Sequence, residues 1–125
     1  MIGVERTDFV SVPVRDLDRA KTFYGETLGI PGNPQAHESY PEFETGNLTI
    51  SLLVSSDDFT PTSSSIALRV QDVVEARKQL EGVGVEFDGE MFDTGVCHVA
   101  FFKDPDGNGL ALHRRYAPYA DGSTP

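Results

Sequence analysis

The feature that most constrains the fold is a residue pattern that occurs twice along the chain. The stretch from Val10 to Ala20 reads VSVPVRDLDRA, and the stretch from Ile66 to Ala76 reads IALRVQDVVEA. In each stretch, apolar residues occupy every second position, and the last of them is a valine. The pattern x-Asp-apolar-x-x-Ala follows directly. Alternating apolar residues indicate a strand with one buried face, and the aspartate that follows can cap the first turn of a helix. The repeat therefore predicts one strand–helix unit in each half of the chain.

The two predicted helices begin directly after the capping residues Asp16 and Asp72. The first runs from about Leu17 to Leu28 and the second from about Val73 to Leu80, because apolar residues recur there at helical spacing. A glycine follows closely after each helix, as expected where a helix ends. Each strand of the repeat is thus predicted to lead into a helix.

Shorter strand signals follow both helices. In the first half they cover Pro41–Thr45 and Leu48–Val54, with a weak one over Ile30–Gln35, and in the second half Val83–Phe87, Gly95–Phe102 and Gly109–Arg115. The last two predicted strands flank the residues Asp-Pro-Asp-Gly-Asn at 104–108, whose turn chemistry predicts a β-hairpin. The predicted order is β-α-β-β-β, twice, which is an α+β fold.

We expect a single domain made of two modules, because 125 residues suit one compact domain. The first module covers about 8–56, and a polar linker covers 57–64. The second module covers about 65–116. The tail at 117–125 has the composition of a mobile chain end.

The charge balance limits the possible partners. Ten basic and twenty acidic residues give a net charge of −10, which disfavours nucleic acid and anionic lipid and favours cationic partners over anionic ones. Simple solubility is the other interpretation of this charge. No apolar run reaches membrane-spanning length, and the first residues lack the apolar core of a signal peptide. The single cysteine, Cys97, fits a reducing compartment, so we expect a cytoplasmic protein.

Two segments, VSVPVRDLDRAKTFYGETLGI near the start and FFKDPDGNGLAL near the end, resemble the vicinal oxygen chelate superfamily. That superfamily includes glyoxalase I, the bleomycin resistance proteins and the extradiol dioxygenases. The resemblance extends from about Asp8 to Arg115. It implies two tandem βαβββ modules whose curved mixed sheets surround a cavity, a small-molecule ligand and a homodimer.

The resemblance also implies where a metal ion would be held. Metal-binding members use His, Glu or Gln at inward-facing positions on the first and last strands of each module. In this sequence those positions fall at Phe9 and Ser65 on the first strands and at Ser51 and Ala111 on the last. None of these is a credible ligand, so we expect no metal and no cofactor. The resemblance therefore favours the metal-free branch, typified by bleomycin resistance proteins, which bind a cationic drug in a dimer-interface groove without changing it.

The candidate ligand-binding residues are those expected on the inner strand faces: Phe9, Ser11, Ser51, Ser65, Arg69, His98, Phe102, Ala111 and His113. Phe9 and Phe102 are the aromatic residues best placed to line the cavity, although Phe9 could equally fill the volume that a metal centre occupies in relatives. Arg69 breaks the alternation of its strand, so it points into the groove, toward a partner subunit, or outward at an exposed edge.

His98 and His113 lie on the two strands that the 104–108 turn joins. In one interpretation they form a close pair that orients a ligand, acts as a general base or binds metal in an unconventional way. In the other, one is a partly buried, hydrogen-bonded histidine and the other is exposed at a strand end. These two histidines are the candidates for catalysis, and the catalytic residues are otherwise unknown.

Three functions stay open on this evidence. The first, which we favour, is a metal-independent protein that binds and sequesters a cationic or aromatic small molecule. The second is a lyase, isomerase or dioxygenase that uses an unconventional metal site or His98 or His113 as acid or base. The third is an interaction module whose cavity is filled by its own side chains. Whether the chain is an enzyme is therefore open.

Overall fold

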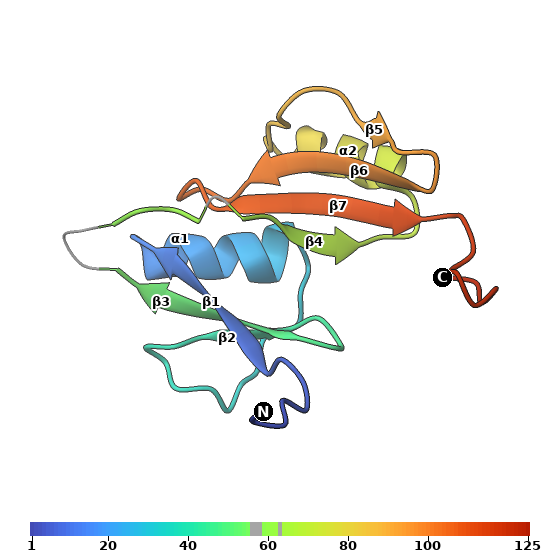
Figure 1. Cartoon of the computed structure of the whole chain (residues 1–125). Helices are drawn as coiled ribbons and strands as arrows, with labels where there is room; N and C mark the ends of the chain where they lie inside the picture. The colour runs from blue at the N-terminus through green and yellow to red at the C-terminus, as the bar shows by residue number, and fades with distance from the viewer. Residues whose placement is uncertain (56–58, 63) are drawn as a thin grey trace. The chain divides into compact units, whose positions relative to one another are not determined.

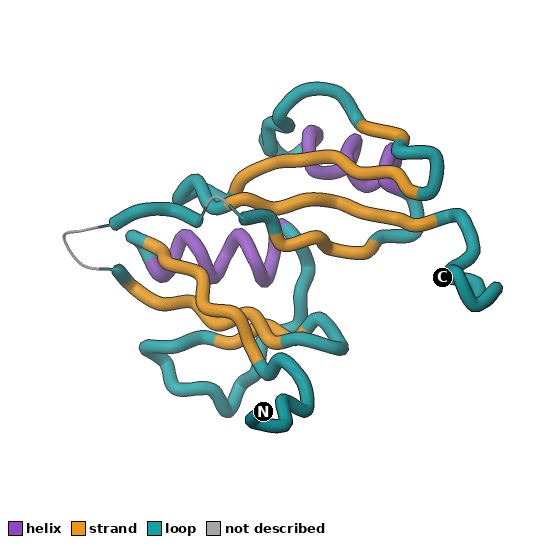
Figure 2. Tube along the Cα trace, in the orientation of Figure 1, coloured by secondary structure: helices purple, strands orange, loops and turns teal. Residues whose placement is uncertain are grey.

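The computed structural model describes residues 1–55, 59–62 and 64–125. The chain divides into two compact units, Met1–Pro61 and Thr62–Pro125, and each combines a mixed sheet with helix (Figures 1 and 2). The predicted α+β fold class is therefore confirmed. Three residues of the predicted linker, at positions 57, 58 and 63, lie outside the described residues.

The first unit contains two helical segments and a three-stranded sheet. Its elements are β1 (Phe9–Val14), α1 (Leu17–Thr22), the π-helical turn η1 (Phe23–Thr27), β2 (Glu42–Glu44) and β3 (Thr49–Val54). The sheet order is β1-β3-β2, with β1 parallel and β2 antiparallel to β3. The helix begins where the sequence predicted, because the Asp16 carboxylate accepts the backbone N–H of Arg19 at 3.0 Å.

The core of the first unit lies between its helical segments and one face of its sheet. The buried residues are Val12, Val14, Ala20, Phe23, Tyr24, Phe43, Ile50 and Leu52. Val12 and Val14 of β1 are thus buried as predicted, whereas Val10 on the same face is half-buried. Helix and sheet approach closely at Gly25, where an added Cβ would lie 3.2 Å from the Phe43 ring. A side chain at Gly25 would therefore require the Phe43 ring to move by a few tenths of an ångström.

The second unit contains one helix and a four-stranded sheet. Its elements are β4 (Ile66–Arg69), α2 (Val73–Gly82), β5 (Phe92–Asp93), β6 (Cys97–Lys103) and β7 (Gly109–Arg115). The sheet order is β4-β7-β6-β5, with β4 parallel to β7 and the other neighbours antiparallel. Asp72 caps α2 by accepting the backbone N–H of Glu75 at 3.1 Å. Neither this helix nor any other in the described ranges could cross a membrane.

The core of the second unit lies between α2 and one face of its sheet. The buried apolar residues on this face are Val73, Leu80, Ala100, Phe102, Leu110 and Leu112. At one end, the turn at 104–108 is held by its own polar side chains. Asp104 accepts backbone N–H groups from Asp106 and Asn108 and the side-chain amide of Asn108, at 2.8 to 2.9 Å. The turn that the sequence predicted is therefore a buried, hydrogen-bonded structure.

Three short elements differ from the sequence-based prediction. The predicted strands Val83–Phe87 and Ile30–Gln35 are reduced to the isolated bridges Phe87–Phe102 and Gly32–Phe43. In the first case the chain is still leaving α2, since the Val85 N–H bonds the Leu80 carbonyl. β5 was not predicted because a two-residue strand carries no alternation signal.

Candidate functional site

The exposed face of the first unit is the sheet face opposite its buried core. It carries Phe9 and Ser11 of β1 and Ser51 of β3, with Ser11 and Ser51 directly opposite each other. These three predicted site residues thus share one face, as strand alternation requires. Phe9 is 59% exposed, so its ring fills no closed space within this unit.

The exposed face of the second unit is built in the same way from all four strands. It carries Ala67, Arg69, Phe92, Cys97, Val99, Phe101, Ala111 and His113. Ala111 is buried in the floor of this face, opposite Ala67 on one side and Phe101 on the other. The Phe92 and Phe101 rings pack edge to face with centroids 6.2 Å apart. Ser65 lies just before β4 and is exposed.

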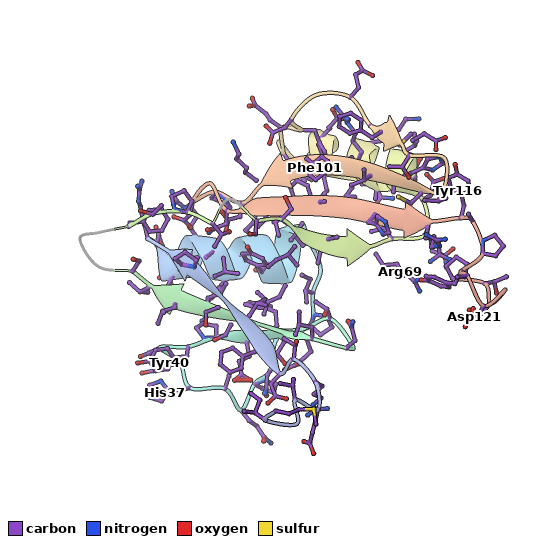
Figure 3. All side chains as sticks on the ribbon, viewed as in Figure 1. His37, Tyr40, Arg69, Phe101, Tyr116 and Asp121 are labelled. Atoms are coloured by element: carbon purple, nitrogen blue, oxygen red, sulfur yellow. The ribbon has the colours of Figure 1, made fainter. Side chains whose placement is uncertain are left out.

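Arg69 points from this face toward the C-terminal tail. Its guanidinium donates to the Tyr119 hydroxyl at 3.4 Å, and Figure 3 shows Arg69 beside the tail. Arg115 is also engaged there, since it donates to the backbone carbonyls of Ala117 and Pro118 and lies over the Tyr119 ring. Both arginines therefore connect the sheet to the tail.

The predicted pair of histidines is not formed. The β6–β7 register places His98 opposite Arg114 and His113 opposite Val99. Because successive side chains of a strand alternate between faces, the two imidazoles lie on opposite sides of the sheet. His113 is on the exposed face, whereas His98 is on the face that packs against α2. The sequence located both strands but did not determine which residues oppose one another.

Phe102 does not line the exposed face either. Its side chain is 1% exposed, lies on the same face as Ala100 and packs on Phe87 with ring centroids 5.0 Å apart. Phe102 is thus a core residue. The aromatic residue of β6 on the exposed face is its neighbour Phe101, labelled in Figure 3.

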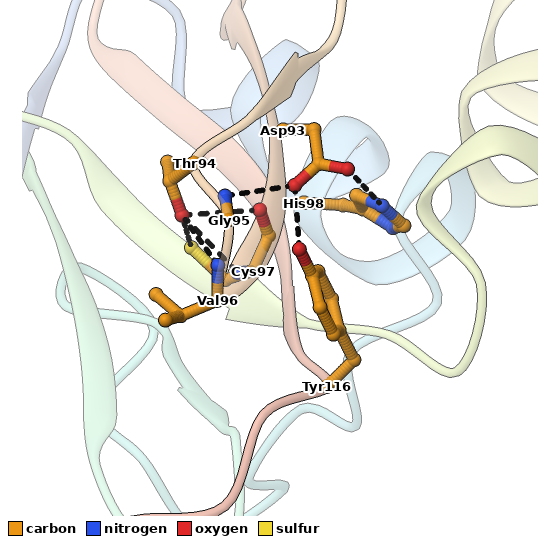
Figure 4. Close-up of polar contacts among 7 residues, drawn as sticks. All are labelled: Asp93, Thr94, Gly95, Val96, Cys97, His98 and Tyr116. Carbon is orange, nitrogen blue, oxygen red and sulfur yellow. Dashed lines mark hydrogen bonds and ion pairs between the residues drawn. The ribbon is translucent and has the colours of Figure 1, made fainter.

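A polar cluster that the sequence did not predict joins β5, β6 and the end of β7 (Figure 4). Asp93 accepts the Tyr116 hydroxyl at 2.7 Å and the Gly95 N–H at 2.9 Å through one oxygen. Its other oxygen lies 3.4 Å from Nε2 of His98, whose ring is 5.0 Å from that of Tyr116. His98 was a predicted site residue, but Asp93 and Tyr116 carry no pattern that would have indicated this contact.

The hydrogen bonds of this cluster change its titration. The Tyr116 hydroxyl, with smaller contributions from Gly95 and His98, lowers the pKa of Asp93. The same bond raises the pKa of Tyr116, because ionising the phenol would remove the donor beside a negative carboxylate. A lowered carboxyl pKa stabilises the fold above the unfolded-state value, and that contribution is lost as the pH falls through the folded-state value.

The Tyr116→Phe variant removes this hydroxyl and tests the assignment. We expect the pKa of Asp93, measured by carboxyl ¹³C NMR, to rise toward its ordinary value. The wild type should then lose more stability than the variant as the pH falls below about 4. An Asp93 pKa that is unchanged in the variant would contradict the role given to Tyr116.

Comparison with known proteins identifies the family of this fold. Residues 6–112 match the model of the Glyoxalase/Bleomycin resistance protein/Dioxygenase superfamily. The chain belongs to this superfamily. The resemblance that the sequence carries is thereby confirmed at the level of the family and the fold. The search of curated proteins found no match to this chain.

Solved structures of the superfamily align over most of the chain. TnmS3, an antibiotic binding protein from Streptomyces sp. CB03234, is 29% identical with a TM-score of 0.75, over 92% of this chain and 99% of that one. A glyoxalase/bleomycin resistance protein from the same organism is 31% identical with a TM-score of 0.70, over 86% and 99%. A putative glyoxalase family protein from Bacillus anthracis has a TM-score of 0.78 at 22% identity, over 92% and 98%, which shows the shared fold alone.

The residues at the positions where the family resemblance implies a metal site show whether this chain could hold a metal ion there. At the four positions where the family resemblance places metal ligands stand Phe9, Ser51, Ser65 and Ala111. A phenyl ring, a methyl group and two neutral hydroxyls do not fit a divalent cation that prefers imidazole, thiolate or carboxylate ligands. Nor do the described residues contain a group of three or more His, Cys, Asp or Glu side chains placed to hold a metal ion.

Proposed function

We propose that this member of the superfamily binds and sequesters an aromatic or cationic small molecule without a metal ion and without changing it. The observation that carries the proposal is the chemistry of the exposed faces. Aromatic, methyl and hydroxyl side chains stand at Phe9, Ser51, Ser65 and Ala111, the positions at which the family resemblance implies metal ligands. Such side chains suit contact with an organic molecule better than coordination of a cation.

The second unit supports an aromatic ligand in particular. Phe92 is 56% exposed and stands edge to face with Phe101, and the small, exposed side chain of Ala67 lies on the same face. Flat rings pack well on such a surface, and a cationic ring system gains further from the aromatic faces. The net charge of −10 favours approach of a cation over that of an anion.

The similarity to TnmS3 supports the same proposal, because that protein is an antibiotic binding protein of nearly the same extent. By the same reasoning we propose an antibiotic-like ligand here. The proposal includes a homodimer, as the family resemblance implies, and a cytoplasmic location, as the single cysteine suggests. Arg69, His113, Ser11, Ser51 and Ser65 are the proposed polar ligand contacts.

Titration calorimetry with bleomycin and with a flat aromatic cation such as ethidium tests this proposal. We expect binding, and we expect Phe101→Ala to weaken it about tenfold, because one ring-stacking contact is lost. Tyr40→Ala is the matched control, since it removes an exposed aromatic ring from a loop of the other unit. Absence of heat and of thermal stabilisation with every ligand would contradict the proposal, and an unaltered affinity of Phe101→Ala would contradict the assigned face.

A second candidate function is acid–base catalysis at His98. The approach of Asp93 to Nε2 of His98 favours it, because a carboxylate fixes the orientation of an imidazole that acts as a base. A His98→Ala variant that keeps full turnover of an identified substrate would exclude this residue as the base.

A further inference from the structure

The second unit contains a cavity of about 640 Å³ that is separate from its exposed face. One wall is the beginning of α2, and the other is formed by His98, Arg114, Tyr116 and the C-terminal tail. This volume lies within the range of about 300–1,000 Å³ that is typical of small-molecule sites. His98 is the only residue of this cavity among the sequence-predicted site residues, so the cavity represents a different site.

Arg114 is the cationic group available to a ligand in this cavity. It lies opposite His98 in the sheet, on the same face, and is half-buried. Within the described ranges its guanidinium has no hydrogen-bond or ion-pair partner, whereas the neighbouring Arg115 donates to two backbone carbonyls. A planar guanidinium with free donors matches a carboxylate in a two-pronged arrangement.

His98 and Tyr116 add a polar and an aromatic wall next to Arg114. Nε2 of His98 faces Asp93 at 3.4 Å, while Nδ1 has no partner among the residues that the structure describes. The Tyr116 ring is held by its bond to Asp93 and lies 5.0 Å from the imidazole. Val74 is exposed on the opposite wall and supplies apolar surface.

The acidic residues near the cavity decide which anion fits. Asp72 is part of the wall, and Asp93 stands behind His98. A phosphate group carries about −1.5 to −2 charges, so these carboxylates repel it more than a carboxylate with a single charge. We propose that this cavity binds a small monocarboxylate, whose charged group pairs with Arg114 and whose apolar part contacts Tyr116 and Val74.

Benzoate is the probe that tests this site on the full chain. We expect ¹H–¹⁵N NMR to show saturable shifts at the amides of Val74, His98 and Arg114. Arg114→Gln should lower the affinity for benzoate at least about tenfold, because it removes a charge-assisted hydrogen-bonded pair. Arg114→Lys keeps the charge but loses the planar fork, so an intermediate affinity is expected. Neutral benzamide and doubly charged phenyl phosphate should both bind more weakly than benzoate.

Lys103→Gln is the matched control, because it removes an exposed cation from the other end of β6 in the same unit and should leave benzoate binding unchanged. Thermal unfolding of each variant confirms that it is folded. Four results would overturn the inference: no benzoate binding, equal affinity in folded Arg114→Gln, shifts centred on Phe92 and Val99, or tighter binding of phenyl phosphate. Because the two sites lie on opposite faces of the sheet, none of these results would contradict the proposed aromatic site.

Discussion

Replacing Phe102 by alanine is expected to lower the free energy of unfolding by about 3–5 kcal/mol. Its ring is 1% exposed and packs on Phe87, so truncation removes a large buried surface and leaves a cavity between the sheet and α2. Domains of this size are stable by only about 5–15 kcal/mol, so a loss of this magnitude is a large share of the total stability. Equilibrium unfolding in urea measures the effect.

Phe101→Ala is the control for this prediction, because its side chain leaves the same strand on the opposite face. The ring is only half-buried, and we expect a loss of about 1 kcal/mol. Ligand affinity should respond in the reverse order, with Phe101→Ala affected more than Phe102→Ala. Similar stability losses in the two variants would contradict the register of β6.

The Asp104→Ala variant is expected to lose about 3 kcal/mol of stability. Its carboxylate accepts two backbone N–H groups and the side-chain amide of Asn108, and Asp104 is buried. Removing it leaves buried donors without acceptors in the turn that sets the register of β6 and β7. Asn108 in turn accepts the N–H of Thr62, so the effect should extend to the segment before β4.

Asp121→Ala is the matched control for the turn. Asp121 also accepts a backbone N–H and a side-chain donor, both from Ser123, but it is exposed. We expect its replacement to change stability by no more than about 0.5 kcal/mol. Equal effects of the two substitutions, measured by thermal unfolding, would show that burial does not set the importance of Asp104.

The parts of the fold that the sequence predicted are those with strong local signals. Both helices begin at the predicted residues because Asp16 and Asp72 each cap a helix by bonding the N–H three residues later. β7 has its predicted bounds, Gly109–Arg115, and its start follows from the turn that precedes it. The exposed positions of Phe9 and Ser11 follow from the alternation of valines with other residues along β1.

The features that the sequence did not predict depend on pairing between distant residues. The predicted contact between His98 and His113 does not form, because the register of β6 against β7 places these histidines on opposite faces of the sheet. The prediction that Phe102 lines the cavity is wrong for a related reason. Nothing in the local sequence of β6 distinguishes the buried face of the strand from its exposed face. The Asp93–Tyr116 bond joins residues that no sequence motif connects, so only the sheet brings them together.

The claim that this protein needs no metal ion is tested most directly by elemental analysis. The full chain, purified without a histidine tag and without chelators, is measured by inductively coupled plasma mass spectrometry. We expect far less than one equivalent of Ni, Zn, Fe or Mn per chain, because Phe9, Ser51, Ser65 and Ala111 offer no suitable ligands. A stoichiometric divalent metal ion that remains bound through dialysis would contradict the proposed function.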